Sequence, residues 1–270
     1  MGDPHLLYDV ADGVATITLN RPERHNAMTP EMVVRLARAW ADIRDDDSVS
    51  VALLTGAGDK SFCSGADLGR LIPLFTGARP ADDDWDQVLL DDRALLDHAL
   101  LRGFDLFKPV VVAVTGNALA GGTELLMGTD FRIASERATF GLTEVRRGII
   151  PAAGSLVRLA RQIPYTAAMQ LILGGEPVDS AFAQHWGLVS EVVAHDQVRA
   201  RAAEVARSVA LGAPIALAKA KEVVVTSSGR PLEDGYRIEN AAMLEVFATN
   251  DAREGPQAFM DKRQPRWTAS

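Results

Sequence analysis

Two glutamates, Glu124 and Glu144, stand in segments whose composition suits acid–base chemistry. Glu124 follows the pair Gly121 and Gly122 in the stretch GNALAGGTELL, directly after the β-branched run PVVVAVT. Glu144 lies in FGLTEVRRGIIPAAG, a glycine- and proline-rich stretch that follows a predicted strand. If the fold brings the two carboxylates together, they could hold a water molecule between them and pass protons to and from it. Each glutamate by itself would equally suit a helix N-terminus or an ordinary loop.

The glycine pair before Glu124 has the layout of a phosphate-binding turn but lacks its cation. The Walker pattern G-x-x-x-x-G-K-[ST] runs from Gly116 through Gly121 to Thr123, yet position 122 is glycine where the pattern requires lysine. Glu124 would also place a negative charge beside the phosphates. The turn is instead suited to an oxyanion, because glycine allows close backbone approach and the first N–H groups of a helix have no intrahelical partner.

Other catalytic and metal-binding patterns are absent from the sequence. The histidines and the single cysteine show no H-x-x-x-H or C-x-x-C spacing, so no metal site is expected. The nucleophile elbow G-x-S-x-G of serine hydrolases does not occur. Cys63 has no histidine near it in the sequence and is expected to be a small packed residue. A single cysteine also excludes an intrachain disulfide, which is typical of intracellular proteins.

The elements that must position the glutamates alternate between strands and helices. Alternating apolar and β-branched residues predict strands at 14–20, 49–58, 109–116 and 130–135. Residues 72–107 interrupt this alternation, and from Gly154 onward the pattern is almost wholly helical. The predicted fold class is therefore α/β, with a core at residues 1–195 and a helical C-terminal region at residues 196–270.

Composition and charge narrow the class of protein. The chain has 270 residues, a formal net charge of −8 and no basic tract, so binding to nucleic acid or to an anionic membrane is not expected. The N-terminus lacks a basic segment followed by an apolar one, and no apolar run approaches the roughly 18 residues of a membrane span. A soluble, cytoplasmic protein is expected.

Three motifs occur in an order that resembles the crotonase superfamily, and enoyl-CoA hydratases in particular. They are SFCSGADL, then KPVVVAVTGNALAGGTELLMGTDFRIAS, then FGLTEVRRGIIPAAG, and the resemblance extends from about Val14 to the C-terminal AFMDKRQPRW. It implies a ClpP-like α/β spiral of repeated β-β-α units with a helical C-terminal trimerisation region. It also implies assembly as a homotrimer or a dimer of trimers, without nucleic-acid or membrane partners.

The resemblance assigns the reacting groups by motif position. The thioester carbonyl of an acyl-CoA would sit in an oxyanion hole formed by the backbone N–H groups of Ala66 and Gly121. Glu124 would orient and deprotonate the water that adds at the β-carbon, and Glu144 would exchange the proton at the α-carbon. Coenzyme A enters as part of the thioester substrate, and no separate cofactor is implied.

The same resemblance indicates residues that bind coenzyme A. Arg24 and His25 in RPERHNA correspond to basic positions near the pantetheine and phosphates, and Asp67 and Leu68 to the segment that lines the adenine site. Lys262 in FMDKRQP is expected to reach the nucleotide from the C-terminal region of the same or a neighbouring subunit. For each basic residue, a solvated surface charge is the alternative.

Three departures from the family pattern leave other activities open. Thr143 stands where proline is common, Leu142 where many hydratases have glutamine, and Ala152 where glycine is common. The leading hypothesis is the reversible hydration of a 2-enoyl-CoA to a 3-hydroxyacyl-CoA. The alternatives are a double-bond isomerase that uses Glu144 alone, a carnitinyl-CoA dehydratase-like enzyme suggested by residues 161–193, and a scaffolding or nucleic-acid-binding homologue that has lost activity.

The segment at residues 72–107 is the part least like the family. Its length favours a role as a lid or acyl-binding segment, with an outer amphipathic helix as the alternative. Its acidic residues are expected to form a solvated helix N-terminus: Asp82, Asp83, Asp84 and Asp86. The side chains expected to line an acyl pocket are Leu74, Phe75, Trp85, Leu89 and Leu90.

Overall fold

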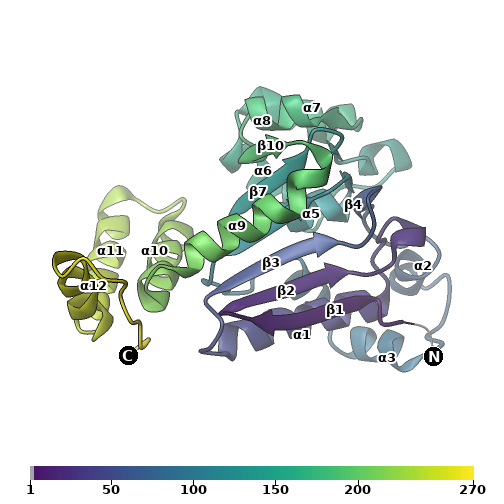
Figure 1. Cartoon of the computed structure of the whole chain (residues 1–270). Coiled ribbons are helices and arrows are strands. Elements are labelled where there is room, and N and C mark those ends of the chain that lie inside the picture. Colours follow the sequence, from purple (N-terminus) through teal and green to yellow (C-terminus); the bar gives the residue numbers. More distant parts are fainter. Residues whose placement is uncertain (1–2) are drawn as a thin grey trace.

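The computed structural model describes residues 3–270, and in it the strands form two sheets (Figure 1). The larger sheet has the order β1-β2-β3-β5-β7-β10 and is parallel except for the pair β1 and β2. Its strands are β1 (Leu6–Ala11), β2 (Val14–Leu19), β3 (Val51–Gly56), β5 (Val110–Val114), β7 (Phe131–Ser135) and β10 (Glu191–Val193). The smaller sheet, β4-β6-β8-β9, consists of β4 (Ser61–Cys63), β6 (Asn117–Leu119), β8 (Thr139–Gly141) and β9 (Val178–Asp179).

The helices fall into three groups along the chain. The N-terminal half has α1 (Pro30–Asp45), α2 (Leu71–Thr76), α3 (Asp84–Asp91), α4 (Ala94–Ala99) and α5 (Gly121–Leu126). Next come α6 (Ser155–Gln162), α7 (Tyr165–Gly174), α8 (Ser180–His185) and α9 (Val198–Ala210), and the chain ends with α10 (Pro214–Ser227), α11 (Leu232–Phe247) and α12 (Asp251–Met260). Single 3₁₀ turns are η1 (Pro22–Arg24), η2 (Glu144–Arg147) and η3 (His195–Gln197). None of the helices at residues 3–270 has the length and apolarity needed to cross a membrane.

The two sheets are built by a repeated unit. β3, β5 and β7 each add a strand to the larger sheet, and each is followed by a short strand, β4, β6 or β8, in the smaller sheet. Successive units therefore stack in parallel, so the loop after β4, the turn after β6 and the loop after β8 come from equivalent points of neighbouring units. This repetition brings together motifs that are far apart in the sequence.

The run PVVVAVT is buried throughout because both faces of the larger sheet are covered. Along β5, Val110, Val112 and Val114 pack into the main core with α1, whereas Val111 and Ala113 pack under α9. A parallel sheet covered on both faces needs apolar residues on both, which explains a continuous rather than alternating apolar strand. Figure 1 shows α9 lying across the sheet, so this helix belongs to the packed body although it begins beyond residue 195.

The expected strands are present, and the edge strand β1 adds to them. Five of its six residues are at least partly exposed, so it lacks the apolar pattern of a buried strand.

Thr29 caps the N-terminus of α1, as its residue type predicts, because its hydroxyl accepts a hydrogen bond from Met32 N at 3.2 Å and Pro30 follows it. α10, α11 and α12 stand to one side of the sheets and have only two buried residues, Asp251 and Ala258 of α12 (Figure 1).

Candidate functional site

A cavity of about 1560 Å³ opens where the loops after β4, β6 and β8 meet α2 and the end of α4. Its charged and polar lining includes Arg21, Arg24, Asp67, Arg70, Asp97, Arg102, Glu124, Thr143, Glu144, Arg146, Arg147 and Glu176. Its apolar lining includes Met28, Leu68, Leu71, Ile72, Phe75, Leu96, Leu100, Ile149 and Ile150. A large pocket with a few convergent charged groups has the shape of a ligand site.

The loop after β4 and the turn before α5 are in direct contact in this cavity. A Cβ placed on Gly65 would lie 3.0 Å from Gly121 N, and one placed on Gly121 would lie 3.7 Å from Ala66 N. A Cβ on Gly122 would collide with the backbone of Cys63. Gly122 is therefore required for the packing of the turn on β4. Gly121 lies close to the backbone nitrogen of Ala66, so the N–H groups of Gly121 and Ala66 are neighbours at the cavity.

The N–H groups of Ala66 and Gly121 are free to bind a ligand oxygen. Neither donates a hydrogen bond to any acceptor among residues 3–270. The neighbouring Ala120 has φ 50° and ψ −125°, a conformation that costs an L-residue free energy. It is held there by its own N–H, which donates to Gly141 O at 2.8 Å, and by Thr123 Oγ1, 2.6 Å from Ala118 O. Strained backbone of this kind is typical of pre-organised sites.

Glu124 is buried in the first turn of α5, with 4% of its surface exposed. Its Oε1 accepts hydrogen bonds from Ala153 N at 2.8 Å, Ser155 Oγ at 2.7 Å and Ser155 N at 3.4 Å. Donors at one carboxylate oxygen favour the ionised form. Glu124 is therefore held in a fixed position at the wall of the cavity, and the alternative of an exposed helix-dipole residue is wrong.

Glu144 is also buried, at 8% exposure, and begins the turn η2. Its Oε2 has no hydrogen-bond partner among the described residues. The pKa of Glu144 is raised to about 7, chiefly by burial and also by the negative charge of Glu124, while backbone hydrogen bonding and Arg147 oppose the rise. The two glutamates thus line one cavity in different surroundings: Glu124 has three donors at one oxygen, and Glu144 has a raised pKa and a buried oxygen with no partner among the described residues.

The departures from the family pattern have structural roles around Glu144. Leu142 is fully buried in the main core, so it anchors the end of β8 by packing. Thr143 lines the cavity, and its backbone oxygen accepts a hydrogen bond from Arg147 Nη1 at 3.0 Å. Ala152 O accepts from Arg102 Nη1 at 3.0 Å. None of the three replacements displaces either glutamate from the cavity.

The residues expected to contact coenzyme A divide into two groups. Arg24, Asp67 and Leu68 line the cavity, with Leu68 64% exposed at its rim. His25 does not line it: its Nδ1 lies 3.0 Å from Ser61 Oγ, beside the smaller sheet. Lys262 follows α12, at the far side of the chain from the cavity, so within one chain it cannot take part in the site (Figure 1).

Asp67 organises the loop that it belongs to. Its Oδ1 accepts from Gly69 N at 2.9 Å and from Arg70 N at 3.1 Å, and its Oδ2 lies 2.8 Å from Arg21 Nη1. Arg21 also donates to Ala27 O at 2.8 Å. The ion pair between Arg21 and Asp67 therefore joins the segment after β2 to the loop after β4. The local sequence gives no signal that Arg21 and Arg102 line the cavity, because only the fold brings them there.

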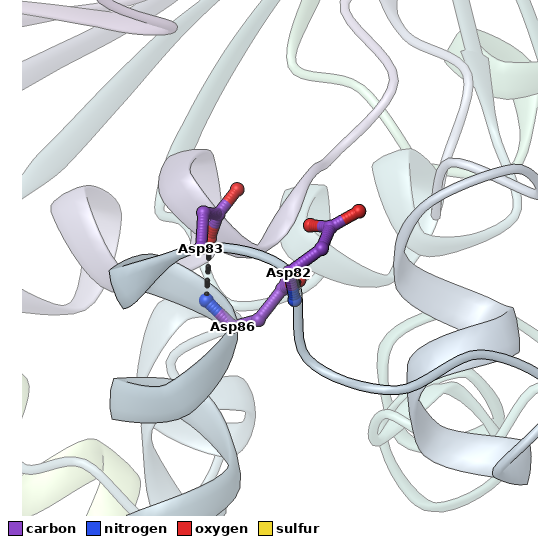
Figure 2. A group of neighbouring side chains, drawn as sticks. All are labelled: Asp82, Asp83 and Asp86. Atoms are coloured by element: carbon purple, nitrogen blue, oxygen red, sulfur yellow. Dashed lines mark hydrogen bonds between the residues drawn. The ribbon is translucent and has the colours of Figure 1, made fainter.

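The acidic residues at 82–86 form the N-terminus of α3 as expected, and Asp82, Asp83 and Asp84 are exposed, but the fourth is not solvated. Asp83 caps α3 by accepting from Asp86 N at 2.8 Å, but Asp86 is fully buried (Figure 2). Arg79 binds both oxygens of Asp86, at 2.5 and 2.7 Å, and holds the pKa of that carboxyl well below its usual range. Arg70 pairs with Asp82 and Asp83. The three carboxylates drawn in Figure 2 thus pair with Arg79 of the same segment and with Arg70 just before it.

The expected acyl-pocket residues of this segment are only partly correct. Phe75 lines the cavity, but Trp85 packs outside it, with Arg35 of α1 4.8 Å from its ring centroid. Leu89 is fully buried in the main core, away from the cavity. The helical spacing of α3 turns these two side chains toward α1, as in the outer-helix alternative. Leu71 and Ile72 of α2 line the cavity instead.

Cys63 is a packed residue, as expected. It is fully buried at the end of β4, and burial raises the pKa of its thiol to about 12. Its sulfur accepts from Gly65 N at 3.4 Å. A thiol that stays protonated at neutral pH is a poor nucleophile, so Cys63 supports the loop and takes no part in covalent chemistry.

Comparison with known proteins identifies the family. A family model described as enoyl-CoA hydratase/isomerase matches residues 9–270. Enoyl-CoA hydratase EchA19 of Mycobacterium tuberculosis is 36% identical, over 98% of this chain and 96% of that protein. The (E)-benzylidenesuccinyl-CoA hydratase of Thauera aromatica is 35% identical, over 95% of this chain and 96% of that protein.

Solved structures confirm the expected fold. The enoyl-CoA hydratase of Bacillus anthracis has a TM-score of 0.88 at 34% identity, over 98% of this chain and 100% of that one. The repeated units, the two mainly parallel sheets and the match along almost the whole length agree with one another. The chain therefore belongs to the enoyl-CoA hydratase/isomerase family of the crotonase superfamily.

Proposed function

We propose that the protein catalyses the reversible hydration of a 2-enoyl-CoA thioester to a 3-hydroxyacyl-CoA. The observation that carries the proposal is the pair of buried glutamates on the cavity that also holds two free backbone N–H groups. One glutamate is fixed by three donors, and the other has a pKa raised to about 7. Addition of water needs all three parts: a base for the water, an acid for the α-carbon and an electrophilic site for the carbonyl oxygen.

The N–H groups of Ala66 and Gly121 would receive the thioester oxygen. As water adds at the β-carbon, negative charge moves onto this oxygen and an enolate develops. Donors already fixed in place stabilise that charge without reorganising, and a single such donor is worth roughly 3–4 kcal/mol. The packing of Gly65 against Gly121 and the constrained backbone of Ala120 keep both donors in position.

The glutamates would move the protons. Glu124, ionised and held by Ala153 and Ser155, takes a proton from the water as its oxygen bonds to the β-carbon. Glu144 gives its proton to the α-carbon, which restores the neutral thioester. The pair holds one proton before and after the step, and dehydration follows the same path in reverse.

Coenzyme A would lie along the basic side of the cavity as part of the substrate. Arg24 and the loop Asp67–Leu68 line this side, which suits the phosphates and the adenine. The apolar side at Phe75, Leu96 and Leu100 would take the acyl chain. His25 and Lys262 are not part of this cavity; Lys262 would contribute only to the site of a neighbouring subunit in a homotrimer or dimer of trimers.

The proposal is tested by incubating the protein with crotonyl-CoA and following the absorbance of the conjugated thioester. We expect loss of absorbance in the wild type and a decrease in turnover of about 10²-fold or more in Glu124→Gln and Glu144→Gln, the range for a lost acid or base. Near wild-type turnover in a folded variant would contradict the mechanism.

Two related activities would give different results in the same assay. A double-bond isomerase would leave crotonyl-CoA intact and convert a 3-enoyl-CoA, and it would depend on Glu144 more than on Glu124. A carnitinyl-CoA dehydratase-like enzyme would act on the corresponding hydroxylated thioester in preference to simple acyl chains. The buried and hydrogen-bonded Glu124 favours addition of water over isomerisation.

A further inference from the structure

Ser155 is the first residue of α6, and its side chain is completely buried. Its Oγ lies 2.7 Å from Glu124 Oε1 and 3.1 Å from Pro151 O. A hydroxyl has a single proton, so it donates to one of these acceptors at a time. The carboxylate is nearer and charged, which makes it the stronger acceptor. The hydroxyl proton is therefore directed at Glu124.

The N-terminus of α6 adds two backbone donors at the same oxygen. Ala153 N and Ser155 N lie 2.8 and 3.4 Å from Glu124 Oε1, and the positive end of the helix also favours a negative charge there. No donor among residues 3–270 contacts Glu124 Oε2. All the hydrogen bonds thus converge on one oxygen of a residue that lines the cavity, and the other oxygen is left for a ligand.

We infer that Ser155 is a positioning residue for Glu124: its hydroxyl fixes Oε1 and keeps the carboxylate ionised, so that Oε2 is presented to the attacking water. The inference rests on the proposed hydratase function. The terminal torsion of a glutamate is broad, so a carboxylate without this donor would sample more orientations. It would also take up a proton more readily, because a hydrogen bond to the charged form is lost.

The test compares Ser155→Ala and Ser155→Thr in the hydration of crotonyl-CoA across pH. The reaction needs one proton on the glutamate pair, so kcat/KM is bell-shaped and its acidic limb reports protonation of the base. In Ser155→Ala we expect kcat to fall about tenfold or more, KM to stay within about twofold and the acidic limb to move up by about one pH unit. Ser155→Thr keeps the hydroxyl, so it should restore most of the wild-type kcat and most of the wild-type position of the acidic limb.

The neighbouring charges remain the same in these variants. Glu144 of η2 and Arg158 of α6 act electrostatically on Glu124, and Arg102 faces Arg158. Ser180→Ala is the matched control, because Ser180 is also a buried first residue of a helix, and its Oγ donates to Glu136 O at 2.9 Å, outside the cavity. This control should leave the pH profile unchanged.

A second measurement separates positioning of Glu124 from general damage to the site. Exchange of the α-protons of butyryl-CoA in D₂O would use the oxyanion hole and Glu144 but not Glu124, so Ser155→Ala should retain it within about twofold of the wild type. The inference is wrong if Ser155→Ala keeps the wild-type pH profile, or if exchange falls in proportion to hydration. A wild type that hydrates no 2-enoyl-CoA would refute the proposed function, and the inference with it.

Discussion

Glu124 and Glu144 differ in what surrounds them rather than in residue type. Glu124 meets three donors at the N-terminus of α6, whereas Glu144 has a buried oxygen with no partner among the described residues. The first environment stabilises a charge and the second disfavours one. In the proposed hydration, these environments would make Glu124 the base and Glu144 the acid, which is the asymmetry that addition of water across a double bond requires.

The raised pKa of Glu144 has a consequence for stability. The folded protein holds this proton up to about pH 7, whereas the unfolded chain releases it near 4.5. The stability that this proton contributes is therefore fully present below about pH 4.5 and is lost as the pH rises through 7. Glu144→Gln removes the titration, so it should raise the free energy of unfolding at pH 8 by about 1–2 kcal/mol relative to the wild type.

Urea unfolding of both proteins at pH 4.5 and pH 8 measures this difference. The two unfolding curves should nearly converge at the lower pH, because the wild-type carboxyl is then protonated in the folded state and half protonated in the unfolded chain. Equal protein concentrations are needed, since association also contributes to stability. The same difference in unfolding free energy at both pH values would show that burial of the ionised Glu144 carboxylate does not destabilise the fold.

The segment at residues 71–99 contacts the cavity through α2 and the main core through α3. α2 presents Phe75 to the cavity, whereas α3 presents Trp85 and Leu89 to α1 and the main core. The buried ion pair between Arg79 and Asp86 joins the end of α2 to α3. Removing one partner would leave a buried charge uncompensated, so this pair keeps α2 against the cavity.

Acyl-chain preference should depend on α2 and not on α3. Phe75→Ala enlarges the apolar side of the cavity, and we expect it to shift the ratio of kcat/KM for long over short acyl chains upward by about tenfold, within the range for one apolar group. Trp85→Ala is the matched control, because its ring lies outside the cavity. A panel of 2-enoyl-CoA thioesters of increasing length measures the ratio. Equal shifts in both variants would contradict the division of the segment.

The whole molecule has one large surface that a single chain leaves uncovered. The helices α10–α12 expose large apolar side chains: Val224, Val225, Leu232, Tyr236, Met243, Leu244, Phe247, Phe259 and Met260. Large apolar side chains exposed in such number on neighbouring helices are typical of protein–protein interfaces. The helices also extend away from the sheets, so another chain could cover them without blocking the cavity (Figure 1).

We predict that this surface assembles the proposed trimer. Leu244→Asp combined with Phe247→Asp should convert the oligomer to monomers, because each introduced charge would be buried without a partner at the interface. Sedimentation velocity measures the mass. Asp91→Lys, at an exposed position of α3 outside α10–α12, is the control and should keep the wild-type mass. Double-variant protein that sediments as the wild type would place the interface elsewhere.

The sequence by itself determined the class of fold and indicated the residues that meet at the cavity. The β-branched strand before Gly121, the glycine pair and the two glutamates are local patterns, and each has a local physical cause such as burial on both faces or close backbone approach. Their order along the chain was specific enough to indicate the family. Ala66, Gly121, Glu124 and Glu144 all line the cavity, as that order implied.

Only the tertiary structure decided what depends on contacts between distant segments. Ser155 lies 31 positions from Glu124 and gives no local signal beyond its place before a helix, yet its hydroxyl contacts the carboxylate. The sequence pattern predicts that Asp86 is one of several surface acids, but in the fold it is buried and Arg79 binds both of its oxygens. Trp85 and Leu89 have the apolar character of pocket residues, but their direction is set by the packing of α3 on α1. Residue type predicts what a side chain can do, whereas its neighbours in space determine its charge, its orientation and its exposure.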